Sequence, residues 1–464
     1  MDQTRRKLLQ AGSAAGFLMA APRVGFAGAH AATAMTARTA RVQLLPAQYS
    51  ATEIWGYDGE LPGAIIRVKQ GERIRRRFVN DLPQPSSVHW HGLRIDNAMD
   101  GVAGLTQPAV PTGDSFDYDF VAPDAGTFWF HAHNRSVEQV ARGLYGALVV
   151  DERIAPDVDR DEVLMLDDWL IDPETAQIET NFDAAHNRSH AGRRGNFVTT
   201  NSQYNLAYDV KQNDRLRLRL INTANARIFE LGLSGLDGWA LAYDGMPLAA
   251  PEKIEGALLL GPGQRVDLFV DVTAAAGETA YLLRADDGQE YSQAAFRVAG
   301  TGATVRRPTP DALPANPGMD VGGLNNAQRF DLTMEGGAMG RLDAAVLNGE
   351  RKSFRQLVSA NQFWAFNGVI GMTDEPLGNL ARGQTARVSI YNDTSFPHAM
   401  HLHGMHFREV LADGALGPLR DTLLMSGGQT RDIAFVADNP GKWLFHCHML
   451  SHAESGMMTW VDVA

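Results

Sequence analysis

Short runs in which apolar and polar residues alternate recur along the chain, separated by Gly, Pro, Asn and Asp. Alternation with a period of two predicts β-strands with one buried face, and the intervening residues predict turns. Stretches with the 3.6-residue period of a helix are scarce. The expected fold class is therefore all-β, built from sandwiches or barrels. The clearest runs lie at residues 64–68, 73–79, 115–121, 146–150, 161–168, 215–221, 265–270, 386–391 and 429–436.

The 464 residues are enough for three domains of ordinary size, and the strands group accordingly. We expect a first unit over residues 36–151, a second over 160–300 and a third over 324–464. Residues 301–323 are rich in Pro, Gly and Ala, which predicts a linker. An alternating strand that ends on Asn recurs once per unit, at residues 73–80, 215–222 and 386–392. Such strands also recur by chance, so this repeat alone leaves duplication open.

Residues 1–29 have the order of a twin-arginine export signal, with Arg5 and Arg6 before an apolar stretch and small residues at 27–29. We therefore expect a periplasmic or secreted protein, exported by the twin-arginine route. The net charge of -12 argues against nucleic acid or an anionic membrane as partner. No later apolar run reaches the length of a membrane span. A monomer is expected.

Ten of the 14 histidines lie in four short motifs or just beyond the last of them. On a strand, residues i and i+2 share a face at a spacing of roughly 6.5–7 Å, too far to chelate one ion but suited to different members of a metal cluster. Neutral imidazole is a good copper ligand. Four His-x-His pairs from two units therefore predict a multinuclear copper site. The motifs are His89-Trp90-His91, His131-Ala132-His133, His398-Ala399-Met400-His401-Leu402-His403 and His446-Cys447-His448, with His452 and Met457 beyond the last.

The single cysteine, Cys447, lies between two cluster histidines and faces the other side of its strand. It therefore has to serve a second metal, for which His398, His452 and Met457 are the available partners. Two imidazoles, one thiolate and a weak axial thioether describe a blue-copper electron-transfer centre. The alternative, a buried inert cysteine, does not account for its two histidine neighbours.

These motifs resemble those of the multicopper oxidases, specifically the three-domain, laccase-like bacterial members. The resemblance covers the first and third units closely, and the middle unit by position and β character. It implies three cupredoxin-like Greek-key domains, the middle one copper-free, and four copper ions. It assigns type 1 copper to His398, Cys447, His452 and Met457, and type 2 copper to His89 and His401. One type 3 copper falls to His91, His131 and His448, and the other to His133, His403 and His446.

The resemblance also implies a reaction. A reductant gives up electrons singly through the exposed edge of His452, and they pass by Cys447 to the cluster, where dioxygen becomes water. Asp100 resembles the family's acidic residue beside the cluster; its alternative is a turn residue before Gly101. Many relatives carry a proton-relay Glu directly after the second type 1 His. Here that position is Ala453, and Glu454 follows it. Glu454 is either a displaced relay or a solvated surface residue, and the one-residue slip favours the surface.

Phenols and aromatic amines are the expected reductants, with cuprous ion, in a copper-tolerance enzyme, as the alternative. Some relatives that oxidise cuprous ion carry methionine-rich inserts, whereas Met334 and Met339 form only a sparse group here. A copper-free cupredoxin scaffold would have broken ligand motifs, and all the expected ligand positions are filled. A copper carrier would need accessible thioethers and thiolates, and a copper nitrite reductase lacks four His-x-His motifs.

Overall fold

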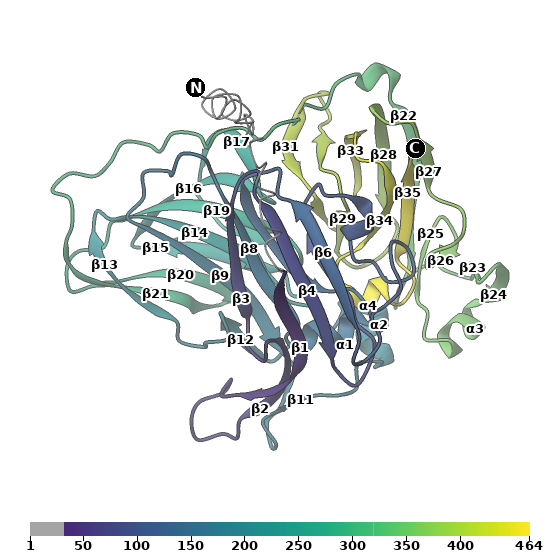
Figure 1. Cartoon of the computed structure of the whole chain (residues 1–464), viewed down its shortest axis with the longest axis horizontal. Coiled ribbons are helices and arrows are strands. Elements are labelled where there is room, and N and C mark those ends of the chain that lie inside the picture. Colours follow the sequence, from purple (N-terminus) through teal and green to yellow (C-terminus); the bar gives the residue numbers. More distant parts are fainter. Residues whose placement is uncertain (1–31, 319) are drawn as a thin grey trace, which may run out of the picture. The chain divides into compact units, whose positions relative to one another are not determined.

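The computed structural model describes residues 32–318 and 320–464. The export signal expected over residues 1–29 lies outside the described residues, so export stays a prediction. None of the described helices combines the length and the apolar character that crossing a membrane requires. The longest of them, α1 (Ser136–Ala141) and α3 (Phe354–Ser359), have 6 residues each. Strands therefore carry almost all of the described architecture (Figure 1).

Residues 33–151 form two four-stranded sheets, and the chain passes repeatedly from one sheet to the other, as in a Greek-key sandwich. Phe78, Trp90 and Phe128 belong to the buried core between the sheets. A 3₁₀ turn, η1 (Asn97–Met99), follows β5. The first sheet, in order β2-β1-β4-β6, comprises β1 (Thr33–Val42), β2 (Thr52–Tyr57), β4 (Arg73–Asp81) and β6 (Ser115–Val121). The second, in order β3-β8-β7-β5, comprises β3 (Gly63–Lys69), β5 (Val88–His91), β7 (Gly126–Ala132) and β8 (Tyr145–Asp151).

Residues 160–301 form a six-stranded and a five-stranded sheet, a short pair and the helix α2 (Ala185–Ser189). The six-stranded sheet comprises, in spatial order, β12 (Phe197–Thr200), β9 (Arg160–Trp169), β14 (Arg215–Asn222), β19 (Arg265–Val272), β16 (Leu236–Tyr243) and β17 (Met246–Lys253). The five-stranded sheet comprises β13 (Ala207–Gln212), β21 (Gln289–Thr301), β20 (Thr279–Asp286), β15 (Phe229–Ser234) and β18 (Leu258–Leu260). The pair is β10 (Ile171–Asp172) with β11 (Gln177–Ile178).

Residues 324–463 form a nine-stranded and a five-stranded sheet, with the short helices η2 (Leu324–Asn326), α3 and α4 (Leu450–Ala453). The larger sheet comprises, in spatial order, β24 (Glu350–Ser353), β23 (Ala344–Leu347), β26 (Val369–Ile370), β25 (Trp364–Phe366), β22 (Gln328–Gly336), β28 (Gln384–Asn392), β33 (Thr430–Ala437), β30 (Phe407–Val410) and β31 (Leu416–Arg420). The smaller comprises β27 (Gly378–Leu380), β35 (Met458–Val463), β34 (Gly441–Cys447), β29 (His398–Leu402) and β32 (Thr422–Met425).

The all-β prediction is confirmed, because every alternating run named above lies in a strand to within one residue. The repeated strand is β4, β14 or β28, and it occupies the same place in each unit; β14 and β28 end on the Asn, and β4 extends one residue beyond it. Each pairs in parallel with the first strand of its unit, β1, β9 or β22. Each pairs antiparallel on its other side, with β6, β19 or β33. The repeat is therefore one of topology as well as of sequence.

The Asn at or next to the end of each repeated strand organises the loop that follows. Asn80, Asn222 and Asn392 are fully buried. The side-chain oxygen of each accepts a hydrogen bond from the backbone N–H two residues later, at 3.1, 3.0 and 3.0 Å. The side-chain nitrogen donates to a carbonyl of the loop. Such Asx turns set the direction in which the chain leaves the strand. In the first and third units, the loop leads into the histidine-bearing strands β5 and β29.

The alternation of β14 does not leave one face in solvent. Every residue of this strand is buried. Its arginines are paired: Arg215 with Asp271 at 2.7 Å, Arg217 with Glu152 at 2.8 Å and Arg219 with Asp161 at 2.6 Å. A buried guanidinium is tolerated only when it is neutralised and hydrogen-bonded. The polar positions of β14 therefore face other parts of the protein, including Glu152 near the end of the first unit.

The expected linker, residues 301–323, makes several contacts with the two preceding units. Leu313 belongs to a small buried cluster with Trp239 and Phe269 of the second unit. The amide of Asn316 exchanges two hydrogen bonds with the backbone of Ala125, at 2.9 and 2.8 Å. The Pro308 carbonyl accepts a hydrogen bond from Arg215 at 2.6 Å. This segment thus packs on residues of both preceding units.

Candidate metal centre

Two antiparallel strand pairs position the four His-x-His motifs. In the first unit, β5 pairs with β7 so that His89 lies opposite His131. In the third unit, β29 pairs with β34 so that His401 lies opposite His446. Directly opposed side chains on an antiparallel pair are close neighbours. Each pair of strands therefore gathers four imidazoles at one place, as the spacing predicts.

The two groups of four imidazoles meet face to face. The rings of His91 and His401 stack with centroids 3.7 Å apart, and those of His89 and His403 stack at 3.8 Å. The ring centroids of His133 and His446 are 5.5 Å apart, and those of His131 and His448 are 5.2 Å apart. Seven of these side chains are buried and only His133 is partly exposed. The structure thus brings all eight predicted cluster histidines together.

Three sets of ring nitrogens lie close enough to hold a metal ion. His133, His403 and His446 form one set within 4.8 Å, the triad that the resemblance assigns to one type 3 copper. His89 and His401, the expected type 2 pair, belong to another set with His403. His91 lies with His131 and His89 in a third. His448 is expected to share a type 3 copper with His91 and His131, and its Nε2 lies 3.4 Å from Nε2 of His131.

The orientation of the rings fits metal ligation. The Nδ1 atoms of His89 and His401 point outward, to the backbone oxygens of Asp100 at 2.9 Å and Asp421 at 3.0 Å. The inward Nε2 atoms of both rings, and Nδ1 of His91, are buried without a hydrogen-bond partner in the described part of the chain. Buried polar atoms rarely lack a partner, and an outer hydrogen bond is typical of metal-ligating histidines. These residues therefore fit copper.

The protonation state of the histidines is also suitable. Burial lowers the pKa of His131, His403, His446 and His448 well below the ordinary value, and neighbouring imidazoles lower it further. A depressed pKa keeps the imidazole neutral near pH 7. Each neutral ring offers a lone pair to a metal.

Asp100 combines the two roles that the sequence left as alternatives. It caps η1, and Gly101 follows with φ 85°, so the Asp-Gly turn is present. Its side chain is nevertheless only 3% exposed. Both carboxylate oxygens lie 3.1 Å from Nδ1 of His403, and Oδ1 lies 3.2 Å from Nδ1 of His89. The turn therefore places a carboxylate against one cluster histidine from each unit.

Asp421 is a second carboxylate at the cluster, and the sequence motifs do not point to it. Its Oδ1 lies 3.3 Å from Nε2 of His91 and 3.4 Å from Nδ1 of His401. Arg265 of the middle unit donates to both of its oxygens, at 2.8 and 2.6 Å. Burial alone would raise the pKa of Asp421, but Arg265 and His91 hold that pKa well below the usual range. A lone Asp between Arg420 and Thr422 carries no spacing signal from which this role could be read.

His398, Cys447 and His452 form a separate buried cluster. Cys447 Sγ lies 3.5 Å from Nδ1 of His398 and 3.8 Å from Nδ1 of His452, and the two Nδ1 atoms are 3.0 Å apart. Met457 is fully buried in the same core, and its backbone oxygen accepts a hydrogen bond from the Cys447 N–H at 3.1 Å. The indole of Trp364 packs on both imidazoles. The expected type 1 ligands are thus brought together.

Cys447 connects this cluster to the histidines beside it. It ends β34 opposite Met400, between His446 and His448. Its backbone oxygen also lies 2.9 Å from Nδ1 of His446. Burial raises the pKa of the Cys447 thiol to about 12. A metal bound here therefore has to displace the thiol proton, as coordination by thiolate requires.

The expectation of an exposed His452 edge is wrong. His452 is fully buried, and its Nε2 lies 2.7 Å from the backbone oxygen of His190. That oxygen belongs to the residue after α2, which lies beside α4 (Figure 1). The edge of the imidazole is covered because the middle unit supplies a backbone group against it. No feature of the local sequence around His452 indicates this contact.

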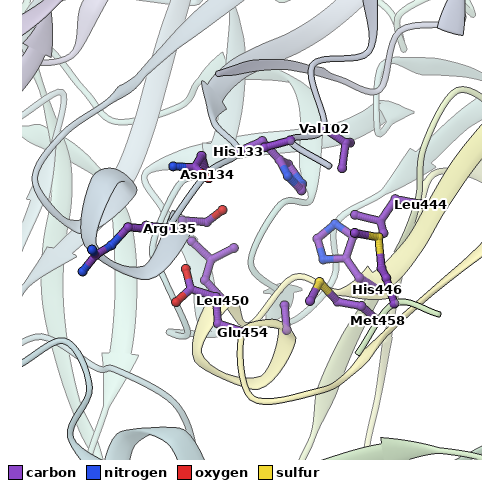
Figure 2. Close-up of a pocket in the computed structure, with 13 residues that line it drawn as sticks. Val102, His133, Asn134, Arg135, Leu444, His446, Leu450, Glu454 and Met458 are labelled. Atoms are coloured by element: carbon purple, nitrogen blue, oxygen red, sulfur yellow. The ribbon is translucent and has the colours of Figure 1, made fainter. Parts of the chain in front are cut away.

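The interpretation of Glu454 as a solvated surface residue is also wrong. Its side chain is 25% exposed, Oε1 accepts a hydrogen bond from the Val137 N–H at 2.8 Å, and Oε2 pairs with Arg188 at 3.1 Å. It lines a cavity of about 150 Å³ together with His133 and His446 (Figure 2). Burial raises the pKa of Glu454. The short helix α4 turns its carboxylate towards α1 rather than into solvent.

Comparison with known proteins agrees with these features. The sequence profile of the multicopper oxidases matches residues 38–154, 160–307 and 349–464, in line with the three cupredoxin-like domains expected. The multicopper oxidase MmcO of Mycobacterium tuberculosis is 31% identical, over 99% of this chain and 96% of its own length. The structure of Lac15 from a marine microbial metagenome is 42% identical with a TM-score of 0.76, covering 93% of this chain and 100% of that one. A multicopper oxidase from Pseudomonas thermotolerans is 31% identical with a TM-score of 0.80, at 94% and 99% coverage.

Proposed function

Because this chain belongs to the multicopper oxidase family, we propose that it oxidises small phenols or aromatic amines one electron at a time and reduces dioxygen to water. The observation that carries this proposal is the position of Cys447. Its side chain contacts His398 and His452, and its backbone is bonded to the cluster histidines His446 and His448. A laccase of Cryptococcus neoformans, 26% identical over 88% of this chain, supports the organic reductants.

Four copper ions would be held as the family resemblance assigns them. His398, Cys447, His452 and Met457 would hold the type 1 ion, and the eight clustered histidines the other three. Bound copper supplies one-electron redox steps and a binding place for dioxygen. The chain holds the ligand nitrogens neutral and oriented, excludes water from them by burial, and joins the two sites through the backbone at Cys447.

Two carboxylates are proposed to supply protons. Asp100 contacts His89 and His403 directly, so its carboxylate orients both rings and lies beside the place where oxygen is reduced. Glu454 lines the cavity that reaches His133 and His446, which are cluster ligands (Figure 2). A carboxyl group whose pKa is raised by burial can carry a proton closer to neutral pH. We propose that protons enter from this cavity.

Cuprous ion is a second candidate reductant. The observation that favours it is the covering of His452, since a planar phenol cannot touch an imidazole whose outer nitrogen is bonded to the His190 carbonyl. An ion bound nearby could donate its electron without such contact.

The Cys447→Ser variant tests the proposed function. Serine lacks the soft sulfur ligand, so we expect loss of the intense blue absorption band and of oxygen consumption. Metal analysis should show one copper fewer, because the eight cluster histidines are unchanged. Oxygen uptake by the wild-type protein is measured in parallel with a substituted phenol, cuprous ion and manganous ion. Turnover retained without the blue band would contradict the proposed electron route, and no uptake with any reductant would contradict the function.

A further inference from the structure

Two histidines of the middle unit have no part in the clusters described above. His186 and His190 lie four residues apart on and just after α2. Their ring centroids are 4.1 Å apart. His186 is exposed and His190 is half-buried. Among the described residues, one other histidine lies outside the clusters, His406, and it is buried. Two imidazoles at this spacing share one face of a helix and can bind one metal ion together.

His190 connects this surface pair to the type 1 cluster. Its backbone oxygen is the group that lies 2.7 Å from Nε2 of His452. Its ring Nδ1 lies 2.9 Å from the Ser189 hydroxyl, so Nε2 is the nitrogen left for a ligand. A short covalent path through Cβ and Cα therefore joins the half-buried imidazole of His190 to a hydrogen bond on His452.

The helix α2 is held firmly in this position. Arg188 pairs with Glu454 at 3.1 Å and donates to the hydroxyl of Ser455 at 3.3 Å. The indole N–H of Trp364, which packs on His452, donates to the Arg188 carbonyl at 2.5 Å. The third unit therefore contacts Arg188 both through its side chain and through its backbone carbonyl. These contacts hold the His190 carbonyl against His452.

One further side chain near α2 suits a soft cation. The N–H of Ala338 donates to the Ser189 carbonyl at 2.6 Å, which places the Gly337–Gly340 turn against α2. The next residue in that turn, Met339, is 76% exposed. Thioether and imidazole together favour cuprous copper. Asp183, just before the helix, is exposed but pairs with Arg188 at 2.7 Å, so its charge is already matched.

We propose that His186 and His190 bind a cuprous ion as reducing substrate, and that its electron reaches His452 through the His190 carbonyl. This inference rests on the proposed oxidase function and identifies where the second candidate reductant binds. Each bound cuprous ion loses one electron and leaves as cupric ion. Four such electrons, with four protons, convert one dioxygen into two waters. A site with only two fixed ligands can release its product and bind the next ion.

Binding is tested with silver ion, a monovalent soft cation that does not change oxidation state under these conditions. The copper-loaded protein is titrated by calorimetry, with the blue band monitored to verify that no copper is displaced. We expect one silver ion to bind, and the affinity to fall by about tenfold or more in His186→Ala and His190→Ala. The matched control, Asn187→Ala, changes the same helix without removing an imidazole. Equal silver binding by the double histidine variant and the wild type would overturn the proposal.

Electron entry is tested by mixing a cuprous acetonitrile complex with the oxidised protein without oxygen. We expect the blue band to bleach about tenfold or more slowly in both single variants. His190→Ala keeps the backbone carbonyl, so its visible and EPR spectra should match the wild type. Altered spectra, or unchanged bleaching rates, would overturn the proposal. Oxygen uptake by the wild type with a phenol separates failure of this inference from failure of the proposed function. If the wild type takes up oxygen and the histidine substitutions leave silver binding unchanged, only this inference fails.

Discussion

At the scale of single residues, the cluster depends on carboxylates that orient imidazoles. Asp100 faces His89 and His403, and Asp421 faces His91 and His401. Each carboxylate therefore touches one histidine from the first unit and one from the third. An acceptor on the outer nitrogen places the proton there and leaves the inner nitrogen free for the metal.

Asp421→Asn should weaken copper binding at the cluster. The amide keeps one acceptor, but it no longer neutralises Arg265, which remains buried. We expect a loss of about 3 kcal/mol in stability and a fall of about 10- to 100-fold in copper affinity. Thermal unfolding, metal content and the type 2 EPR spectrum are compared with Asp413→Asn, an exposed control. A lower melting temperature with unchanged copper content and EPR would mean that Asp421 acts only on stability.

Glu454→Gln should slow turnover without altering the copper sites. Glutamine can still accept the hydrogen bond from Val137 but cannot carry a proton. We expect kcat to fall by about tenfold or more with little change in KM. Because burial raises the pKa of Glu454, the wild-type rate should decline as pH rises through that pKa. The variant should lack this decline.

The matched control for that experiment is Glu375→Gln, which changes an exposed carboxylate in the third unit. A Glu454→Gln variant with the same kcat and the same pH profile as this control would show that protons take another route.

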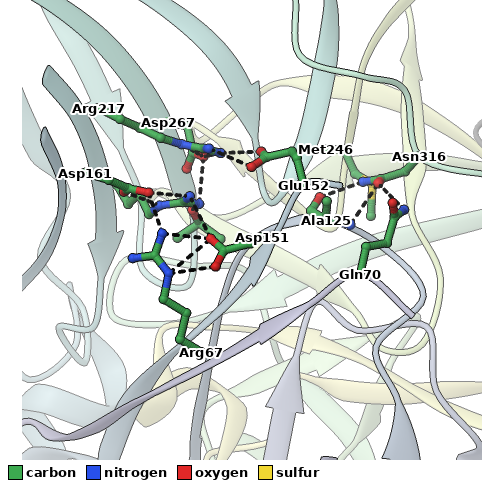
Figure 3. Close-up of polar contacts among 12 residues, drawn as sticks. Arg67, Gln70, Ala125, Asp151, Glu152, Asp161, Arg217, Met246, Asp267 and Asn316 are labelled. Carbon is green, nitrogen blue, oxygen red and sulfur yellow. Dashed lines mark hydrogen bonds and ion pairs between the residues drawn. The ribbon is translucent and has the colours of Figure 1, made fainter. Parts of the chain in front are cut away.

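At the scale of elements, the strand β14 carries a buried electrostatic network (Figure 3). Burial alone would raise the pKa of Asp161, but its bonds to Arg219 and the charges nearby hold that pKa at about 2. An unfolded aspartate titrates near about 3.9. The lowered pKa thus contributes stability above about pH 4, and this contribution is lost as pH falls towards about 2.

Asp161→Asn should therefore destabilise the protein by about 2 kcal/mol at pH 7, with the difference shrinking between about pH 4 and pH 2. Melting temperatures of variant and wild type are measured across this range. Asp114→Asn, an exposed change in the first unit, is the control. A difference that stays constant down to the lowest pH at which both proteins fold would show that Asp161 does not act through its charge.

The strands could be predicted from the sequence, whereas the surroundings of several site residues could not. Alternation reports which side chains share a face, so the His-x-His pairs and the opposite side of Cys447 follow directly. It does not report what covers each face. The arginines of β14 alternate as surface residues do, yet their partners Glu152 and Asp161 come from other parts of the chain. The helix α2 is too short to show a period, and its place against His452 depends on contacts with residues far along the chain.

At the scale of the whole molecule, the metal centres differ in how they join the units. The four ligands expected for type 1 copper all come from the third unit. The eight cluster histidines come equally from the first and third, and the middle unit contributes Arg265 against Asp421. Copper in the cluster therefore ties together elements that are separated by more than two hundred residues of sequence.

Removing copper should lower the melting temperature in two distinguishable steps. An ion that binds only the folded protein stabilises it by about 4 kcal/mol when its free concentration is a thousand times its Kd. Cys447→Ser loses only the ion held within the third unit, so its melting temperature should lie between those of the copper-loaded and copper-free wild type. The copper-free protein also loses the ions that join two units, and calorimetry should show its transition broadening or splitting. Readdition of copper to the copper-free protein should restore the single transition. If the serine variant has the same melting temperature as the copper-free protein, the cluster ions add no stability. The two units are then held together by their protein contacts alone.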